Sequence, residues 1–429
     1  MKRVDTILKE VLEKINPSKE EFTIIEISLG KFLGDIKKEI RKSKLNIDIF
    51  VGGSYAKNTL IRKNRYDIDI FLRFDQKHKK NLDGLSEKIM KKFENVLKVH
   101  GSRDYFRIGI NPKVFFEIVP VLKVEKSENA DNITDLSYMH VRYINKKIKS
   151  KKIFDEIRIA KAFCYANNCY GAESYINGFS GYGLELLIYH YGSFLQFIKK
   201  IVKSKKEEKI IIDIEKLHKN RQRILIDLNA SKLHSPIILI DPTYKNRNAL
   251  AALSKETFDK FKESCKKFLK SPSINSFKNQ KIDFEHSKKF AEKKNYDFVL
   301  LKIKTSKAEG DVAGSKLIKF YRHLEKEISK FFEIKEGEFE YNEKKSAEVF
   351  FSGKSKKEIL TKGPFIKDEK NVRNFKKKHK KTFVRKNHIY TKEKIDFSLK
   401  KFIEDWEKEN KVKMKDMTIK RLEITSPSS

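Results

Sequence analysis

The stretch that decides the fold is Val51-Gly-Gly-Ser-Tyr-Ala-Lys-Asn-Thr-Leu-Ile-Arg-Lys-Asn-Arg-Tyr-Asp-Ile-Asp-Ile-Phe-Leu-Arg-Phe74. A β-branched run over residues 47–51 stops at its Gly-Gly-Ser turn, and a second apolar run closes it. Asp67 and Asp69 lie at the mouth of this second run. Because residues two apart in a strand face the same side, we expect both carboxylates to project from one face of a sheet.

The same stretch predicts nucleotide chemistry. Two adjacent carboxylates repel each other unless a cation lies between them, and hard oxygen ligands suit Mg²⁺. Gly52 and Gly53 let the backbone approach a ligand, and Ser54 offers a hydroxyl and an N–H at an expected helix N-terminus, where phosphate binds well. For the Asp-x-Asp alone, a strand that opens with solvated acids is the alternative. A phosphate site beside a metal pair favours chemistry on a nucleoside triphosphate.

Composition indicates a polyanionic partner. The chain has 429 residues, with 96 Lys and Arg against 59 Asp and Glu, and a net charge of +37. That length allows about two to four domains, and that charge favours nucleic acid as the partner. The abundance of Lys, Ile and Asn is also what an A/T-rich genome would produce, so mutational bias is the alternative source of part of the charge.

Cysteine usage and hydropathy predict a cytoplasmic protein. Cys164, Cys169 and Cys265 are odd in number and form no C-x-x-C pair, so we expect reduced, buried thiols. No apolar signal region and no run of membrane length occurs in the sequence. We therefore expect a soluble protein with no membrane partner.

A third acidic residue stands in a later apolar run. Glu117 is the one acid within residues 114–120. A lone charge in a buried strand is costly unless it is paired or binds a metal ion. A carboxylate on a neighbouring strand would complete a two-metal site with Asp67 and Asp69. A Glu at a strand end near solvent is the alternative.

The rest of the chain reads as helices followed by a mixed module. Apolar periodicity predicts helices at 4–15, from Pro17 to about residue 44, at 82–99 and at 155–167, and a solvated helix at about 203–223. Residues 271–276, Ser-Pro-Ser-Ile-Asn-Ser, are the clearest linker, and strands alternate with helices beyond it. Arg247, in an expected loop, suits a base edge or a phosphate, or else a surface salt bridge. The basic segment 367–386 would repel itself unless an RNA or DNA backbone neutralised it.

A series of short motifs runs in order along the chain. They are Gly53-Ser-Tyr-Ala-Lys-Asn-Thr59, Asp67-Ile-Asp69, Glu117-Ile-Val-Pro120, His140, Glu156-Ile-Arg-Ile-Ala-Lys161, Tyr170-Gly-Ala-Glu173, Gly178-Phe-Ser-Gly-Tyr182, Glu185-Leu-Leu, Tyr191-Gly-Ser-Phe194, Asp241-Pro, Arg247-Asn248, Gly363-Pro-Phe and Asn371-Val. With this order and spacing the chain resembles the archaeal (class I) CCA-adding enzymes over almost its whole length. These are tRNA nucleotidyltransferases of the DNA polymerase β-type superfamily.

The resemblance implies an α+β multidomain fold with three regions. Residues 1–140 would form the polymerase β-type nucleotidyltransferase palm, which is the catalytic domain. Residues 141–270 would form a helical central domain for nucleotide and base recognition. Residues 271–429 would form an α+β C-terminal body and tail that hold tRNA.

The resemblance also implies the site residues. Asp67, Asp69 and Glu117 would be the catalytic carboxylates and the ligands of a two-ion Mg²⁺ site. In this chain Glu117 stands where the family usually has Asp, and Lys57 stands where it usually has Arg. The nucleotide-binding residues would be Gly53, Ser54, Lys57, His140, Lys161, Tyr170 and Arg247.

The implied function is template-independent addition of C, C and A to the 3′ end of tRNA from CTP and ATP, with release of pyrophosphate. The tRNA would be bound by its acceptor stem and T-arm. A homodimer is the expected assembly that we consider. Two alternatives stay open. One is a poly(A)- or oligoadenylate-type nucleotidyltransferase, and the other is a non-catalytic RNA-binding protein on the same scaffold, which Glu117 favours.

Overall fold

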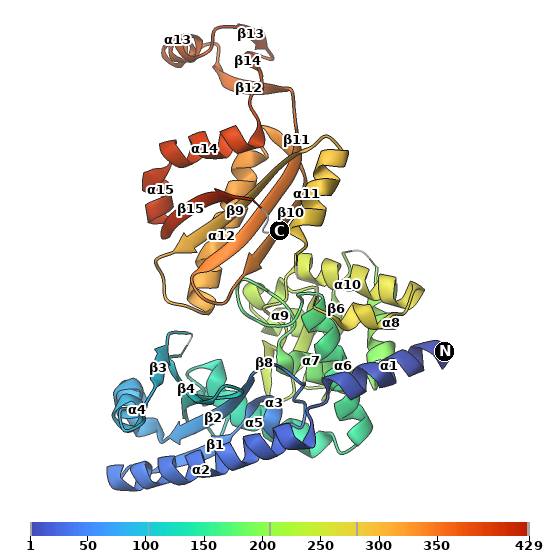
Figure 1. The fold of residues 1–429 in the computed structure, drawn as a ribbon, viewed down its shortest axis with the longest axis vertical. Helices are drawn as coiled ribbons and strands as arrows, with labels where there is room; N and C mark the ends of the chain where they lie inside the picture. The colour runs from blue at the N-terminus through green and yellow to red at the C-terminus, as the bar shows by residue number, and fades with distance from the viewer. Residues whose placement is uncertain (1, 102, 206, 280–281, 427–429) are drawn as a thin grey trace. The chain divides into compact units, whose positions relative to one another are not determined.

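Figure 1 shows the computed structural model of the chain, which describes residues 2–101, 103–205, 207–279 and 282–426. The chain folds as two compact units, one up to residue 280 and one from residue 281. Helices and sheets occur in both units, so the predicted α+β multidomain class is confirmed. Within the described residues, no helix combines the length and the apolar character needed to cross a membrane.

One part of the first unit is built on the sheet that carries the quoted stretch. Its strands lie in the order β1-β2-β5-β4-β3, with β2 and β5 parallel and the other neighbours antiparallel. Helix α2 begins at a capping box formed by Ser18 and Glu21, and its apolar stripe packs on one face of this sheet. The bounds are α2 (Lys19–Ser43), β1 (Ile47–Val51), α3 (Gly53–Ala56), β2 (Tyr66–Phe74), η1 (Gln76–Asn81), α4 (Leu82–Met90), β3 (Val96–Val99), β4 (Tyr105–Asn111) and β5 (Val114–Leu122).

The helix predicted over 82–99 is wrong beyond Met90. Residues 96–99 form β3, because they pair with β4 at the edge of the sheet. A periodic apolar pattern of this length fits a helix or a strand, and the non-local pairing decides between them. The helix predicted from Pro17 to about residue 44 is confirmed as α2.

Helices dominate the rest of the first unit and share one aromatic core. Phe163, Phe179, Phe197, Phe261 and Phe268 are fully buried in this core. The N-terminal helix α1 (Lys2–Ile15) packs on this cluster through Leu8. The other elements are η2 (Ser127–Asn129), η3 (Ile133–Leu136), α5 (Ser137–Lys147), α6 (Lys151–Ala166), α7 (Gly181–Tyr191), α8 (Phe194–Lys203), α9 (Arg221–Asp227), η4 (Ala230–Leu233), α10 (Lys255–Lys270) and η5 (Ile274–Phe277).

A small sheet accompanies these helices. It consists of β6 (Ile210–Ile212), β7 (Ile237–Asp241) and β8 (Tyr244–Asn248), and β6 pairs with β7 in parallel. The solvated helix predicted at about 203–223 is therefore wrong. The β-branched run 210–212 joins a buried strand, and only the short helix α9 forms nearby.

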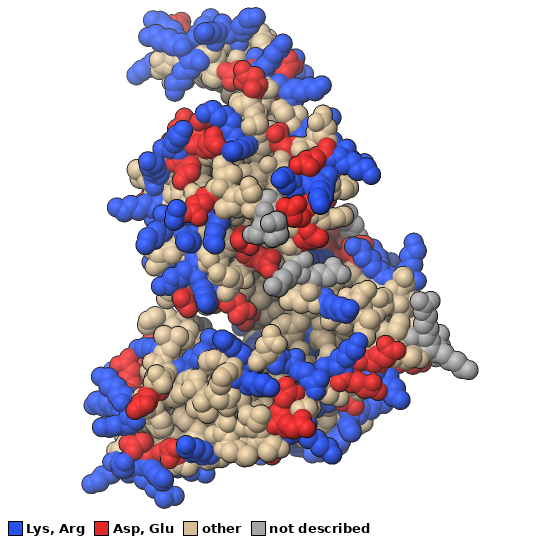
Figure 2. All heavy atoms as spheres, in the orientation of Figure 1, with Lys and Arg blue, Asp and Glu red and all other residues tan. Residues whose placement is uncertain are grey.

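The second unit is built on an antiparallel sheet with the strand order β10-β11-β9-β15. Helix α12 packs on it through Leu317, Phe320 and Leu324, and α14 through Ile403 and Trp406. A smaller sheet, ordered β12-β14-β13, carries α13, and Figure 2 shows that Lys and Arg crowd this part of the unit. The bounds are α11 (Phe284–Lys293), β9 (Asp297–Thr305), α12 (Asp311–Ile328), β10 (Phe332–Tyr341), β11 (Ser346–Ser355), β12 (Glu358–Phe365), α13 (Glu369–Lys378), β13 (Thr382–Arg385), β14 (His388–Lys394), α14 (Leu399–Glu409), α15 (Lys411–Asp416) and β15 (Ile419–Thr425).

Candidate active site

Three carboxylates lie on adjacent strands of the first sheet. Asp67 and Asp69 are on β2, and Glu117 on β5 is the direct parallel partner of Asp69 in the strand register. The alternating residues Ile68 and Ile70 are buried in the core with α2, so the acids project from the opposite face. The sheet thus presents the three predicted acids on one side.

The electrostatics of this face are those of crowded negative charge. Burial raises the pKa of Asp69, the charges of Glu117 and Asp67 raise it as well, and Lys57 opposes them, so that the pKa is about 7. Burial also raises the pKa of Glu117, which Arg107 partly offsets. A divalent cation binds carboxylate oxygens and neutralises their mutual repulsion. The three acids therefore have the donor chemistry that fits a divalent cation. In the described parts of the chain, however, no three His, Cys, Asp or Glu side chains already surround a common metal position.

Glu117 has an ion-pair partner that the sequence did not indicate. Arg107 on β4 lies opposite it in the antiparallel register. The Nε and Nη2 atoms of Arg107 both donate to Oε1 of Glu117, at 3.1 and 2.5 Å. The acid predicted as a metal ligand is therefore held by a guanidinium in this structure.

Gly53 brings the backbone directly against the carboxylates. Its φ is +61°, and a Cβ built on it would lie 1.7 Å from Oδ2 of Asp69. The N–H of the preceding Gly52 donates to the carbonyl of Asp69 at 2.9 Å. Ser54 follows in the short helix α3. A side chain at position 53 would displace Asp69, so glycine is required here.

A second cluster joins two of the predicted nucleotide-binding residues, both lysines, through a buried acid. Lys57 follows α3, Lys161 lies on α6, and Glu185 lies on α7. The Lys57 Nζ is 2.6 Å from Glu185 Oε2, and the Lys161 Nζ is 2.9 Å from Oε1. Thr59 completes the cluster, because its hydroxyl donates to Oε1 of Glu185 at 2.9 Å and accepts from Lys161 at 2.6 Å.

A third cluster gathers around Asp241 at the end of β7. Its Oδ2 lies 3.0 Å from Nε2 of His140 and accepts from Nη1 of Arg247 at 2.6 Å, while Oδ1 accepts from the Tyr182 hydroxyl at 3.0 Å. The rings of His140 and Tyr182 stack with centroids 4.0 Å apart. Burial lowers the pKa of His140, against the pull of Asp241. The predicted residues His140 and Arg247 are thus neighbours that share one carboxylate.

Tyr170 is placed by ring stacking. It is part of the bend that leads to α7, and its ring stacks on Tyr165 with centroids 4.2 Å apart. The ring of Tyr165 lies beneath the ammonium of Lys63, 4.8 Å from its centroid, and its hydroxyl accepts from that ammonium at 2.9 Å. Tyr170 lies near Glu185. The pKa of the Tyr170 phenol is raised first by burial, second by Tyr165 and third by the charge of Glu185.

Sequence reasoning missed Glu185, Asp241 and Arg107 as members of the site. Glu185 left a signal, because it is the one acid in the apolar run 184–188. Asp241 ends the apolar run 237–240 in the same way. Arg107 left none, because its role depends on the register of two strands.

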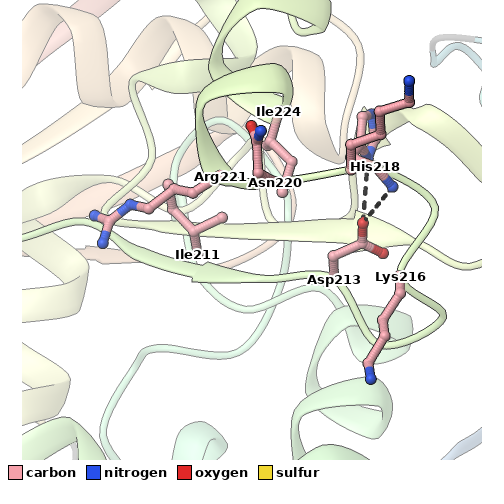
Figure 3. Close-up of a pocket in the computed structure, with 8 residues that line it drawn as sticks. Ile211, Asp213, Lys216, His218, Asn220, Arg221 and Ile224 are labelled. Carbon is pink, nitrogen blue, oxygen red and sulfur yellow. Dashed lines mark hydrogen bonds and ion pairs between the residues drawn. The ribbon is translucent and has the colours of Figure 1, made fainter.

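Among the described residues of the first unit are two pockets of similar size. One, of about 220 Å³, is lined by Arg247, Gly178 and Ser180 together with residues 248–252, and so adjoins the Asp241 cluster. The other, of about 270 Å³, lies around β6 and α9 and includes none of the predicted site residues. In Figure 3 His218 turns onto Asp213, while Lys216 and Arg221 point away from each other.

Comparisons with known families match the first unit in two parts. Residues 155–278 match the family described as tRNA nucleotidyltransferase, second domain. Residues 1–141 match the Second Messenger Oligonucleotide or Dinucleotide Synthetase domain.

Curated relatives from archaea carry one name. The CCA-adding enzyme of Nanoarchaeum equitans is 40% identical over 253 residues, which are 58% of this chain and 61% of that enzyme. The CCA-adding enzyme of Methanocaldococcus jannaschii is 29% identical over 413 residues, 92% of this chain and 88% of that enzyme. The match to the Pyrococcus abyssi enzyme is 33% identical over 63% of this chain and 60% of that one. The chain thus spans less than two thirds of two of these relatives and most of the third.

Solved structures share the fold of about two thirds of the chain. A cytoplasmic RNA terminal U-transferase aligns with a TM-score of 0.51 at 10% identity, over 66% of this chain and 100% of that one. Cid1, described by its RNA terminal uridylyl transferase activity, aligns with a TM-score of 0.50 at 12% identity, over 65% of this chain and 98% of that one. At these identities the likeness concerns the fold alone.

Proposed function

We propose that this chain, which belongs to the family of the archaeal CCA-adding enzymes, adds C, C and A to the 3′ end of tRNA from CTP and ATP and releases pyrophosphate. The observation that carries the proposal is the pairing of a carboxylate face with a buried cation cluster in one unit. Asp67, Asp69 and Glu117 supply the first, and Lys57 and Lys161 supply the second. The two clusters have the charges that a nucleotidyl transfer needs.

The enzymes of this family generally use divalent metal ions. We infer that the ions are two Mg²⁺ and that Asp67, Asp69 and Glu117 hold them, because these acids repel one another on a common face. When bound, such ions lower the pKa of an attacking hydroxyl and stabilise the charge of a leaving pyrophosphate. Glu117 reaches this role only if it leaves Arg107 or offers its second oxygen.

Lys57 and Lys161 are proposed to bind the triphosphate. With Glu185 between them, the two ammonium groups leave one net positive charge in a buried place, and a polyphosphate is a suitable counter-charge. The backbone at Gly53 and Ser54 approaches from the carboxylate side, where N–H groups suit phosphate oxygens. Preorganised donors of this kind stabilise the charge that develops in the transfer. Tyr170 would position the nucleotide from the adjacent bend.

Arg247 is proposed to contact the incoming base, with His140 beside it. Asp241 fixes one face of the guanidinium through Nη1, so the remaining N–H groups keep a defined direction. A guanidinium donates but does not accept, so it would contact a base through its acceptor atoms, which both C and A present. The growing tRNA end would complete the base pocket, and no nucleic-acid template is needed.

The basic part of the second unit is proposed to bind the T-arm of tRNA, with the body on the acceptor stem. The small sheet exposes Phe383 by 43% and Val384 by 60%, and Phe383 stacks on Tyr390. Helix α13 adds Lys376, Lys377 and Lys378 in its last turn. Exposed aromatic rings beside lysines suit an RNA surface. The homodimer and the cytoplasmic location stay predictions, and light scattering of the purified protein tests the first.

The test of the proposed function is Asp69→Asn, with Asp75→Asn as the matched control because Asp75 follows β2 and pairs with Lys123 instead. Asp69→Asn is expected to abolish nucleotide transfer to tRNA and to leave tRNA binding nearly unchanged, since only the metal site is altered. Asp75→Asn should keep both. Retained transfer by Asp69→Asn overturns the assignment of the carboxylates.

A further inference from the structure

Glu185 is a buried acid in an otherwise apolar helix. Its side chain is fully buried on α7, between leucine and isoleucine side chains that form the core. An ionised carboxylate in such a place is costly unless its oxygens are fully hydrogen-bonded. Both oxygens are used, since Oε2 binds Lys57 and Oε1 binds Lys161 and Thr59. The acid therefore holds a specific arrangement of cations.

The groups that Glu185 joins come from different parts of the chain. Lys57 and Thr59 belong to the segment after α3, which leads to the carboxylates of β2, whereas Lys161 is on α6. Lys57 is 10% exposed and Lys161 is 3% exposed at the side chain. Without the acid, two ammonium groups would be pushed apart in a low-dielectric place. The close approach of the two ammonium groups therefore depends on Glu185.

We propose that Glu185 is a positioning residue that holds the ammonium groups of Lys57 and Lys161 side by side as the anchor for the triphosphate of the incoming nucleotide. This inference rests on the proposed function, because it takes a nucleoside triphosphate as the ligand of the cluster. Glu185 itself contacts the lysines and Thr59, so it acts on the ligand through them.

The same geometry sets how the cluster responds to pH. Burial lowers the pKa of Lys161, Glu185 opposes this, and the charges of Lys57 and Lys63 lower it as well, so that the pKa is about 8. Burial alone would raise the pKa of Glu185, but Lys161 and Lys57 bring it to about 2. Glu185 therefore stays ionised, and Lys161 loses its proton as the pH rises through about 8. Among the described residues, the Tyr170 phenol also lies near Glu185, and burial raises its pKa well above this range. Lys57 in turn interacts electrostatically with Asp69 and His140 and lies over the ring of Tyr182.

Replacing Glu185 by glutamine removes the charge that keeps Lys161 protonated. The pKa of Lys161 then falls, so at neutral pH part of the anchor is uncharged. A lower pH restores the proton and, with it, the affinity for triphosphate. A merely structural defect has no such pH dependence, because a misplaced side chain is not returned by a proton.

The experiment is calorimetric titration of the full chain with CTP and Mg²⁺, without tRNA, from about pH 6 to about pH 9. The wild type should bind CTP more weakly as the pH passes about 8. Glu185→Gln, with the pKa of Lys161 lower by about one unit, should bind about threefold more weakly than the wild type near pH 7.5 and nearly tenfold more weakly near pH 9, and the difference should close toward pH 6. Glu185→Asp keeps the charge and should keep the wild-type pH profile even if its affinity is lower.

The matched control is Glu156→Gln, a half-buried acid, which accepts the N–H of Phe194 away from the lysines. It should leave the pH profile of CTP binding unchanged. A constant weakening by Glu185→Gln at every pH, no weakening at all, or no CTP binding by the wild type overturns the inference. Transfer to tRNA by the wild type is measured separately. A wild type that shows the expected CTP profile but adds no nucleotide contradicts the proposed function and leaves this inference standing.

Discussion

At the scale of single residues, position 53 has the strictest requirement for glycine. Its positive φ and the 1.7 Å approach of a built Cβ to Asp69 both exclude a side chain. We expect Gly53→Ala to lower the rate of nucleotide transfer by about 10²-fold, because catalytic geometry is sensitive to displacements of about 1 Å. Single-turnover kinetics with saturating nucleotide measure it.

Gly30 on α2 provides the control for that substitution. A Cβ built at Gly30 has no neighbour within 4 Å, and the residue lies inside a helix. Gly30→Ala should therefore keep the transfer rate and raise stability by roughly 0.5–1 kcal/mol. Equal transfer rates for the Gly53 and Gly30 variants would contradict the close packing at the carboxylates.

The raised pKa of Asp69 makes the stability of the metal-free protein depend on pH. Its pKa is about 7 in the folded chain, above the ordinary value, because of burial and the neighbouring acids. The folded state thus holds this proton more tightly than the unfolded state, and the stability it contributes is present at low pH and disappears as the pH rises toward 7. In a chelator, the thermal unfolding temperature of the wild type should fall more steeply from about pH 4 to about pH 7 than that of Asp69→Asn. Identical pH dependence of the two proteins would count against the crowding of these carboxylates.

Sequence reasoning placed the predicted residues better than it placed their partners. Asp67 and Asp69 were expected on one face of a strand, and β2 places them so, because a strand alternates its faces. The ion pair of Glu117 with Arg107 depends on the register of β4 against β5, and Glu185 reaches Lys57 and Thr59 across more than a hundred positions of sequence. Such interactions follow from the packed fold and leave no local pattern.

At the scale of elements, α7 connects the site to the helical core. Its first turn is capped by Ser180, whose hydroxyl accepts from the N–H of Gly183 at 3.1 Å and donates to the carbonyl of Ala249 at 2.9 Å. Ser180→Ala should cost about 1 kcal/mol of stability, as removal of an N-cap does, and should weaken CTP binding because Tyr182 and Glu185 follow in the same helix. Urea unfolding and calorimetric titration measure the two effects.

Ser398, the N-cap of α14 in the second unit, is the matched position. Ser398→Ala should cost a similar amount of stability and leave CTP binding unchanged. If both variants weaken CTP binding equally, the effect of Ser180 is general destabilisation and the role given to α7 is wrong.

The helices that were predicted correctly have strong local signals. For α2 these are the cap at Ser18 and a long apolar stripe. The predicted helices over 82–99 and 203–223 failed where β3 and β6 pair with other strands. A short β-branched or apolar run forms a strand instead of a helix when a neighbouring strand is available to pair with it.

At the scale of the whole molecule, charge is the property that the sequence predicts most directly. The net charge of +37 and the crowded lysines of α13 both suit a polyanion. Replacing Lys376, Lys377 and Lys378 by glutamine should weaken tRNA binding and reduce the slope of log affinity against log salt by roughly 0.7–0.9 for each phosphate that the protein no longer neutralises. The same change at Lys31, Lys37 and Lys38 on α2 is the control and should alter both far less. Equal effects of the two triple variants would show nonspecific attraction.

The arrangement of the whole chain was only partly open to prediction. The order of motifs indicated the α+β multidomain class and the family, because each motif has a local sequence. The packing of α1 on the helical core through Leu8 was not indicated, since an amphipathic helix shows that it is buried but not against what.

Nucleotide addition itself is tested by a transfer assay with Mg²⁺ on tRNAs that end at the discriminator base, at C and at CC, given one labelled nucleotide at a time. If the chain adds CCA, CTP is added to the first two and ATP only to the third. Addition of A alone to all three would instead indicate a poly(A)-type enzyme. Binding of tRNA without any addition would contradict the proposed function and leave an RNA-binding protein on a nucleotidyltransferase scaffold.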